Sequence, residues 1–499
     1  KVLLLIGTNV TETHPITSLR VKEALRVYGA KVIAVDSATT NILKLASHPL
    51  LIAPGGEPWF IRALVKAVLE EDLVDEAATN SAPQAFAALK QAVGGLSWET
   101  LTALSGASKE SVVEAARIYA EAPRAVILCA EGVTRRADGY ASILNLVDLA
   151  WVTGKLTKPG CGINALPEEA NEQGAVDMGV APELLPGQAA YHDEEARARI
   201  AQAWKTALPA GPAAGADLME ILARCRRGEI KALYLVGENP LATLPASTGV
   251  QEALEKVEFL LCQDPFLTET GRLAHVVLPA ATFAEKDGTF TDLQGKVNRV
   301  RQSVDLYEEA RPDWEVFAAL GSALGYAMDY DSSQAIQTEI MKLLPGYYNL
   351  GEPRPITAGP EGYLSDGYVR EVTRRYAAGE TPSASRPFAL MMGQVLYHSG
   401  KLSTRASGLI KLYPNKRRLQ MNPADRAQLQ LTDEDLVRVT SDLGSVELRT
   451  EVCHDLQPGS CFFPEHFNEP PVKDLFECVV DPTTGVPAFK LVRVTIEKV

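Results

Sequence analysis

The fold is decided by two apolar runs and the polar residues that follow them: KVLLLIGTN at residues 1–9 and KVIAVD at residues 31–36. Residues 2–6 are all apolar and stop at Gly7, which is typical of a parallel strand buried on both faces. Residues 15–28 carry apolar side chains among polar ones, which predicts a helix, and Gly29 is a plausible residue to end that helix. The stretch therefore predicts a strand–helix–strand unit in which Asp36 closes the second strand.

Similar patterns continue along the chain. Further buried strands are predicted at residues 125–129, 231–236, 259–262 and 275–278, and helices at residues 59–73, 144–152, 196–207, 314–324 and 333–344. Residues 158–187 hold four prolines and five glycines with weak periodicity, which predicts a long ordered loop. Residues 354–386, rich in Gly, Pro, Ser and charge, predict a linker. Alternating segments at 436–440, 446–450 and 491–496 predict a β-rich domain after it.

Composition excludes several classes of protein. Of 499 residues, 46% are hydrophobic and 22% charged, as in ordinary globular proteins. No apolar run reaches the ~18 residues of a membrane span, and a net charge of −14 argues against a nucleic-acid partner. The seven cysteines form no C-x-x-C pair, so we expect no metal or cluster site among them. Because the chain starts inside a strand without Met, we expect it to be a piece of a longer polypeptide.

Two strands end in related polar turns, GTN at residues 7–9 and GEN at residues 237–239. A glycine there lets the backbone approach a phosphate, and the following helix N-terminus offers free N–H groups. Asp36 could accept hydrogen bonds from a ribose or a guanine. The pattern thus suggests two related nucleotide-binding halves, although each turn alone also fits an ordinary tight strand-to-helix connection. No G-x-G-x-x-G is present, which disfavours a nicotinamide site.

A more specific resemblance rests on motifs spread over the whole chain. They are GTNVTETHP at 7–15, GIN at 162–164 with NEQGAVDMG at 171–179, GENP at 237–240, QDPFLTET at 263–270, FAEKDGTFT at 283–291, HSGKLSTR at 398–405, MNPAD at 421–425 and FPEHFN at 463–468. In this order, they resemble the molybdopterin oxidoreductases of the dimethyl sulfoxide reductase superfamily. The resemblance implies an α/β fold of doubly wound Rossmann-like layers with a C-terminal β-barrel of double-psi type. We expect domains at 1–165, 166–380 and 387–499.

The resemblance also implies cofactors: two molybdopterin guanine dinucleotides with Mo or W, provided that the cleft is functional. His14 and His398 could serve that site or merely stabilise a turn and a core. The cofactor-binding residues that it implies are Gly7, Asn9, Glu12, Thr13, His14, Asp36, Gly132, Thr134, Gly237, Glu238, Asn239, Pro240, Gln263, Asp264, Thr268, His398, Ser403, Asn468 and Lys490.

The sequence departs from the family in two respects. The cysteine-rich iron–sulfur segment and the metal ligand would lie upstream of Lys1, so we assign no catalytic or metal-ligating residue and expect that the chain cannot relay electrons alone. Formate dehydrogenases carry an arginine in N-P-x-R-G-x-N-N, whereas residues 164–171 read NALPEEAN. The missing arginine and a repelling Glu168 argue against binding of a formate carboxylate.

We therefore expect the molybdopterin-type portion of a multisubunit redox complex, with the large subunit of NADH-quinone oxidoreductase as the main hypothesis. A formate dehydrogenase alpha-like enzyme and a cofactor-free scaffold are the alternatives. The implied partners are other subunits of a redox complex. The implied location is the cytoplasm, with any attachment to a membrane made through partner subunits.

Overall fold

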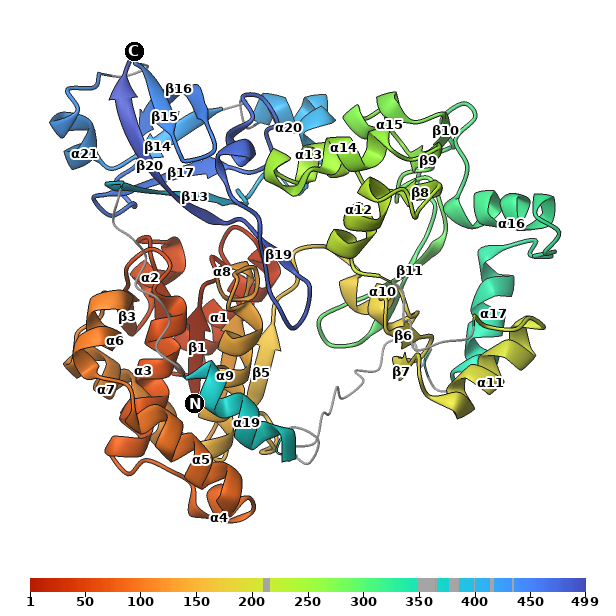
Figure 1. Cartoon of the computed structure of the whole chain (residues 1–499). Helices are drawn as coiled ribbons and strands as arrows, with labels where there is room; N and C mark the ends of the chain where they lie inside the picture. Colours follow the sequence, from red (N-terminus) through yellow and green to blue (C-terminus); the bar gives the residue numbers. More distant parts are fainter. Residues whose placement is uncertain are drawn as a thin grey trace. The chain divides into compact units, whose positions relative to one another are not determined.

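The computed structural model describes residues 1–209, 216–345, 347, 364, 366–376, 386–398, 400–412, 417–432 and 435–499. The chain forms two compact units. Figure 1 shows the ribbon coloured along the sequence, from red at the N-terminus to blue at the C-terminus. Unit 1 comprises Lys1–Glu168 and Ala358–Val499, and unit 2 is the stretch Glu169–Thr357 between them. The expected boundaries of three domains stay a prediction.

The first half of unit 1 is built on a parallel sheet in the order β3-β2-β1-β4-β5. Its strands are β1 (Val2–Ile6), β2 (Lys31–Asp36), β3 (His48–Leu51), β4 (Ala125–Cys129) and β5 (Gly162–Ala165). This is the strand order of a doubly wound fold. Strands β2 and β3 are added on one side of β1, and β4 and β5 on the other, so the strand order reverses between β1 and β4. Ligands of such folds bind beyond the carboxyl ends of the strands at that point.

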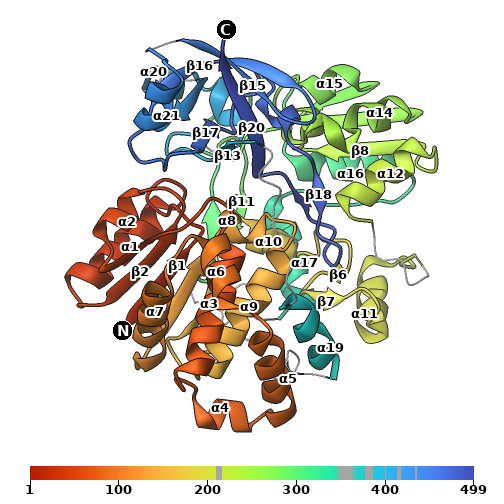
Figure 2. The ribbon, with the colours of Figure 1, turned by 60° about the vertical axis from the view of Figure 1, so that its left-hand side comes forward.

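Both faces of this sheet are covered, as the apolar runs predict. Leu5 and Val32 pack with Val21 of α1 on one face, and Leu4 and Ile33 pack against α3 and its neighbours on the other. Figure 2 shows α1 and α2 on one side of the sheet and α3, α7 and α9 on the other. The helices are α1 (Pro15–Arg26), α2 (Asn41–Leu45), α3 (Glu57–Glu70), α4 (Glu76–Asn80), α5 (Pro83–Gly94), α6 (Trp98–Ser105), α7 (Lys109–Glu121), α8 (Glu131–Thr134) and α9 (Gly139–Val152).

The second half of unit 1 is a closed six-stranded barrel in the order β13-β17-β14-β16-β15-β20. Its strands are β13 (Phe388–Gly393), β14 (Arg418–Met421), β15 (Leu436–Thr440), β16 (Ser445–Val452), β17 (Ser460–Pro464) and β20 (Leu491–Lys498). Alternate residues, such as Val437 and Val439 of β15, point into one apolar core. Together with the doubly wound sheet, the barrel confirms the predicted fold class. Around it lie α20 (Ser407–Leu412), α21 (Pro423–Gln428) and the short pair β18 (Val479–Val480) and β19 (Pro487–Ala488).

Unit 2 contains a parallel sheet in the order β10-β9-β8 and an antiparallel β11–β12 hairpin. Its strands are β8 (Ala232–Val236), β9 (Phe259–Asp264), β10 (Val276–Pro279), β11 (Gly288–Thr291) and β12 (Val297–Val300), with short β6 (Leu184–Leu185) and β7 (Ala189–Ala190). Its helices are α10 (Glu172–Asp177), α11 (Glu194–Trp204), α12 (Leu218–Arg226), α13 (Pro240–Thr243), α14 (Val250–Glu255), α15 (Glu269–Leu273), α16 (Asp313–Ala323) and α17 (Ser333–Leu343).

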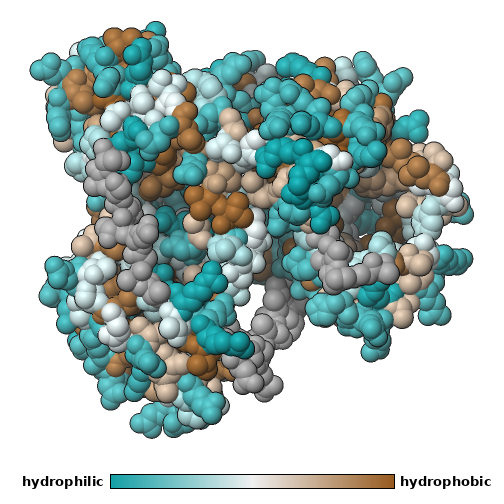
Figure 3. All heavy atoms as spheres, viewed as in Figure 1, coloured by the Kyte–Doolittle hydropathy of each residue, from teal (hydrophilic) through white to brown (hydrophobic). Residues whose placement is uncertain are grey.

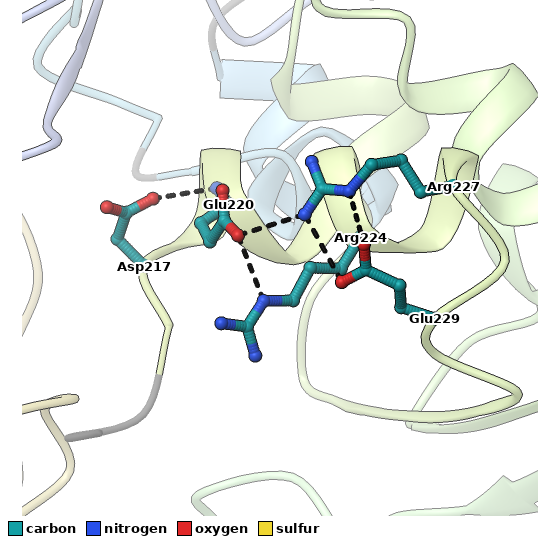
Figure 4. Close-up of polar contacts among 5 residues, drawn as sticks. All are labelled: Asp217, Glu220, Arg224, Arg227 and Glu229. Carbon is teal, nitrogen blue, oxygen red and sulfur yellow. Dashed lines mark hydrogen bonds and ion pairs between the residues drawn. The ribbon is translucent and has the colours of Figure 1, made fainter. Parts of the chain in front are cut away.

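Helix α12 shows how polar side chains fix a helix end at the surface (Figure 4). Asp217 accepts a hydrogen bond from the Glu220 N–H at 2.9 Å and caps the first turn. Glu220 binds Arg224 at 2.9 Å and Arg227 at 3.1 Å, and Arg227 also binds Glu229. Hydrogen bonds from the two arginines lower the pKa of Glu220. Because these side chains are largely exposed, the network contributes little to the stability of unit 2.

Two expectations from the sequence are wrong. The predicted loop at 158–187 contains β5, α10 and β6; β5 escaped notice because an edge strand that is only half-buried, reading GINA, needs no apolar run. The predicted linker at 354–386 lies partly outside the described residues, but it includes α19 (Asp366–Arg375). The buried Tyr368, Val372 and Tyr376 join α19 to the core of the first half of unit 1. These three apolar positions among charged residues were too few for the sequence pattern to predict helix α19.

The surface agrees with the composition. The face seen in Figure 3 is mostly hydrophilic, with apolar side chains in small scattered groups. None of the helices in the described part of the chain combines the length and apolar character that crossing a bilayer requires.

Candidate functional site

Unit 1 contains a cavity of about 270 Å³ that is lined by turns after β1, β2 and β4 on one side and by the barrel on the other. It therefore lies where a doubly wound sheet binds its ligand. Eight of the residues implied by the family resemblance line it: Gly7, Asn9, Glu12, Thr13, His14, Asp36, Gly132 and Lys490.

Two glycines bring the turns after β1 and β4 into backbone contact. The Gly132 N–H donates to the Gly7 carbonyl at 3.1 Å, and Gly7 has a positive φ of 57°. A Cβ on Gly132 would lie 2.7 Å from the Gly7 oxygen, so a side chain there would separate the turns. The glycines thus set the width of the cavity floor.

The turn after β1 is held by backbone hydrogen bonds and by the side chain of His14. The Asn9 main-chain carbonyl accepts from the N–H groups of Glu12 and Thr13 at 2.9 and 3.0 Å. His14 contacts the Thr13 hydroxyl with Nδ1 at 2.9 Å and the Pro167 carbonyl with Nε2 at 2.7 Å. Both ring nitrogens of His14 are therefore used to tie α1 to the segment after β5, which supports the turn-stabilising alternative.

Asp36 and Glu57 make the end of β2 an unusually acidic part of the cavity. Burial raises the pKa of Asp36 to about 7 despite a 3.1 Å hydrogen bond from the Ala38 N–H, and the Glu57 charge raises it further. Burial also raises the pKa of Glu57, which lies 3.7 Å from Arg136. Near neutral pH, a hydrogen-bond donor from a ligand would stabilise the ionised form of Asp36.

Four buried oxygens of the cavity lining have no hydrogen-bond partner within the described part of the chain: Thr8 Oγ1, Glu57 Oε2, Glu131 Oε2 and Glu168 Oε1. The three carboxylate oxygens have an ion-pair partner, Arg136 or Lys490, whereas the Thr8 hydroxyl is uncharged. Leaving a buried hydroxyl unpaired costs about 1–3 kcal/mol. A polar ligand would satisfy it, and the residues around it offer a glycine turn for phosphates and carboxylates for a base or a ribose. The lining therefore fits a nucleotide.

The barrel closes this cavity through the loop between β16 and β17. The Gln457 amide donates to the carbonyls of Ser37 and Ile52 at 2.8 and 2.6 Å. Asp455 pairs with Lys44 at 2.8 Å. These contacts fix the barrel against the end of β2, so the cavity depends on both halves of unit 1.

A cluster of charged side chains forms the cavity wall beside β4. Lys490 Nζ lies 2.6 Å from a Glu465 oxygen and 4.0 Å from a Glu168 oxygen, and it also contacts Glu131. Arg135 pairs with Glu168 at 2.9 Å. Glu168 is therefore not the free repelling charge that the sequence suggested, because two cations lie beside it.

The other implied residues of unit 1 do not line the cavity. Thr134 bonds back to the Ala130 carbonyl at 3.3 Å within α8. His398 is buried near the barrel, where its Nδ1 contacts Ser403 at 3.2 Å and its ring lies 5.5 Å from that of His466. Asn468 follows in the segment after β17.

The seven implied residues of unit 2 lie at the carboxyl ends of β8 and β9 or in the turns that follow them. Asn239, after β8, donates to Glu269 at 2.8 Å and accepts from the Thr270 hydroxyl at 2.7 Å. Thr268 caps α15 through the Gly271 N–H at 3.0 Å. The residues in this group are Gly237, Glu238, Asn239, Pro240, Gln263, Asp264 and Thr268. Unit 2 thus repeats the strand-turn geometry of unit 1.

Comparison with known families agrees with this geometry. A family model described as molybdopterin oxidoreductase matches residues 1–323, and one described as a molydopterin dinucleotide binding domain matches residues 388–493. The chain belongs to the molybdopterin oxidoreductase family. The resemblance stated from the sequence motifs is thereby confirmed, and the second match covers the barrel of this oxidoreductase.

The relatives of this oxidoreductase include formate dehydrogenases. It is 33% identical to the F420-dependent formate dehydrogenase subunit alpha of Methanocaldococcus jannaschii over 100% of this chain and 76% of that protein. It is 28% identical to formate dehydrogenase H of Escherichia coli, over 100% of this chain and 73% of that protein. Acetylene hydratase from Pelobacter acetylenicus shares the fold, with a TM-score of 0.76 at 16% identity, covering 100% of this chain and 78% of that one.

Several cavity residues of this oxidoreductase were missed in the sequence. Glu57 and Arg136 carry charges in the cavity lining, and Glu131 forms the charged wall with Glu465 behind it. One signal was available for Glu131, because it follows the strand end at Cys129 just as Asn9 follows β1. Glu465 lies in a quoted motif, but nothing in the sequence shows that it meets Lys490.

Proposed function

We propose that this chain is the molybdopterin-binding portion of a formate dehydrogenase-like alpha subunit that works with other redox subunits. The observation that carries the proposal is the cavity of unit 1, about 270 Å³ in volume, which is lined by eight implied residues and by the buried Thr8 hydroxyl, which has no hydrogen-bond partner among the described residues. Support also comes from relatives that are named as alpha subunits of formate dehydrogenases. These relatives favour the formate dehydrogenase-like alternative. The sequence had led us to the large subunit of NADH-quinone oxidoreductase as the main hypothesis.

Named residues would hold one guanine dinucleotide in unit 1. The backbone of the Gly7 turn would receive phosphate, the Asp36 carboxylate would accept from guanine or ribose, and Thr8 Oγ1 would bind a further polar atom. The related turn at Gly237–Pro240 supports a second dinucleotide on unit 2. When bound, the pterin with its Mo or W would supply two-electron redox chemistry. The residues of the protein would bind and orient this cofactor and would exchange protons.

The direct test is the content of the purified protein. Molybdenum and tungsten are measured by mass spectrometry, and the GMP that acid hydrolysis releases is measured in the same sample. We expect about two GMP per chain together with one of the two metals. Neither GMP nor metal, in protein purified with its partner subunits, would contradict the proposal.

The raised pKa of Asp36 predicts how guanine binding depends on pH. Ionised Asp36 accepts two guanine N–H groups, and with a pKa of about 7 its ionised fraction rises roughly tenfold between pH 6 and pH 8. We therefore expect the cofactor-free protein to bind guanosine roughly tenfold more tightly at pH 8 than at pH 6. Calorimetric titration measures the affinity. The Asp36→Asn variant should bind weakly at both values, and an equal pH slope in that variant would exclude Asp36 as the cause.

A cofactor-free scaffold is the second candidate, and one observation favours it. Residues 164–171 lack the arginine that the resemblance to formate dehydrogenases implies, and Pro167 and Glu168 stand in this stretch instead. In that case the cavity would bind no pterin, and the same measurement of metal and GMP distinguishes the two candidates.

A further inference from the structure

The charged wall of the cavity brings together five ionisable side chains from four segments. Glu131 and Arg135 come from α8 and the residue after it, Glu168 from the segment after β5, Glu465 from the end of β17, and Lys490 from the start of β20. Oxygens of the three glutamates lie within 4.8 Å of one another. The side chains of Glu131, Glu168 and Lys490 are only 15%, 13% and 12% exposed.

The carboxyls of this wall lie close together. Three carboxyls face two cations of this wall, Lys490 and Arg135, and the Lys401 ammonium binds the main-chain carbonyl of Glu465 beside them. Oxygens of the three carboxyls lie within 4.8 Å of one another in a poorly solvated place, so full ionisation is costly. Closely spaced carboxyls of this kind share a proton, and the geometry therefore favours one neutral carboxyl at neutral pH.

Glu168 is the carboxyl that holds the proton. Lys490 contacts Glu131 and Glu465 closely but lies 4.0 Å from Glu168, which leaves Glu168 the least compensated by lysine. Burial, together with hydrogen bonding to and the charge of Glu131, raises the pKa of Glu168. Burial is the largest influence on Glu131 and raises its pKa, but the charges of Lys490 and Arg135 and the hydrogen bonds with Glu168 and Lys490 together outweigh burial and lower the pKa. The resulting pair is one carboxylic acid beside one carboxylate.

We propose that Glu131 and Glu168 form a proton relay between the cavity and the protein surface beside Arg135. Both carboxyls line the cavity, and Arg135, paired with Glu168 at 2.9 Å, is 44% exposed. A proton that arrives from the cavity binds the Glu131 carboxylate, while the Glu168 acid releases its own proton to water at the protein surface beside the 44% exposed Arg135. Transfer of the proton from Glu131 to Glu168 then restores the pair.

This inference rests on the proposed function, because a relay needs a reaction that produces a proton. Oxidation of formate converts HCOO⁻ into CO₂, one H⁺ and two electrons. The electrons leave through the redox centres of the holoenzyme, and the relay carries the proton. A divalent cation is not needed to bind the three glutamates, because the Lys490 ammonium already contacts two of them and lies 4.0 Å from the third.

Infrared spectroscopy tests the relay without any cofactor. At pH 7 we expect Glu168 to contribute a C=O stretch of a buried protonated carboxyl beside any contribution from Asp36 and Glu57, whose pKa values are also raised. The Glu168 band is therefore defined as the part of the signal that Glu168→Gln removes. We expect this band to shift as soon as the protein is mixed with D₂O, and Glu131→Gln should slow the shift. Glu121→Gln, at an exposed position of α7, is the matched control and should change neither. The absence of the band, or a band that stays unshifted for hours, would overturn the proposal.

The holoenzyme, reducing a viologen dye with formate, gives a second readout. In Glu168→Gln we expect kcat to fall about tenfold or more and KM to stay within about twofold, because the side chain keeps its size and loses only its proton. An unchanged kcat would overturn the relay. A holoenzyme without GMP or metal would instead refute the proposed function, while the infrared band would still report the shared proton.

Discussion

Replacing Asp148 with alanine is expected to destabilise unit 1 by about 3–5 kcal/mol, because it would remove the buried carboxylate that pairs with the buried Arg375. Asp148 lies on α9 with no exposed side-chain surface, and Arg375 of α19 binds it at 2.8 Å while only 3% exposed. The hydroxyls of Tyr368 and Tyr376 donate to the same carboxylate at 2.7 and 3.2 Å. One substitution thus breaks three buried interactions that fasten α19.

The measurement is urea unfolding followed by tryptophan fluorescence, to which Trp151 contributes; Trp151 packs edge-to-face on Tyr368 with ring centroids 5.9 Å apart. The control is Glu447→Ala, which removes an exposed pair with Arg438 at 2.9 Å. For such a pair, we expect a loss of less than about 1 kcal/mol. Equal losses in the two variants would mean that Asp148 and Arg375 are not buried together.

Replacing Gly7 with alanine is expected to damage both the fold and the cavity. The added Cβ would lie 2.9 Å from the carbonyl carbon of Gly132 and 3.0 Å from the nitrogen of Val133. Both are backbone atoms, so the clash cannot be relieved by a side-chain rotation. The positive φ of Gly7 adds about 1–2 kcal/mol of strain, and overpacking adds about 1–3 kcal/mol. Because the turns after β1 and β4 would move apart, we also expect GMP content to fall.

Gly29 offers a matched control for this variant. Its φ of 62° is close to the 57° of Gly7, but a Cβ there would meet no atom within 4 Å. Gly29→Ala should therefore show the backbone strain alone and leave GMP content unchanged. If urea unfolding gave the same free energy for both variants, the close approach between the turns after β1 and β4 would play no part in stability.

The strands of this protein were predictable where burial on both faces makes them continuously apolar. Residues 2–6 and 125–129 are such segments, and the predicted bounds equal those of β1 and β4. Strand β5 and helix α19 were missed for a common reason. An edge strand and a helix with three buried side chains need few apolar residues. Those residues are buried only by segments that are distant in the sequence, so the local pattern does not reveal them.

The site was predictable only in part, for a related reason. Gly7, Asn9 and Asp36 stand next to strand ends, so the topology of the sheet brings them to one edge. Glu57, at the start of α3, and Arg136, between α8 and α9, reach the cavity because of how these segments pack, which local sequence does not encode. The same holds for Glu465, which contacts Lys490 behind the lining. The charge on Glu168 was misjudged because its partners Arg135 and Lys490 are 33 and 322 residues away in the sequence.

The order of the chain through unit 1 has a consequence for biosynthesis. Unit 1 comprises Lys1–Glu168 and Ala358–Val499 with unit 2 between them in the chain, so Lys490 and strand β20 (Leu491–Lys498) follow unit 2 in the order of synthesis. A nascent chain can fold its first sheet early, but the barrel and the charged wall stay open until those residues leave the ribosome. A nucleotide that needs the finished cavity must therefore be loaded after translation of this region, onto a protein whose units are already folded.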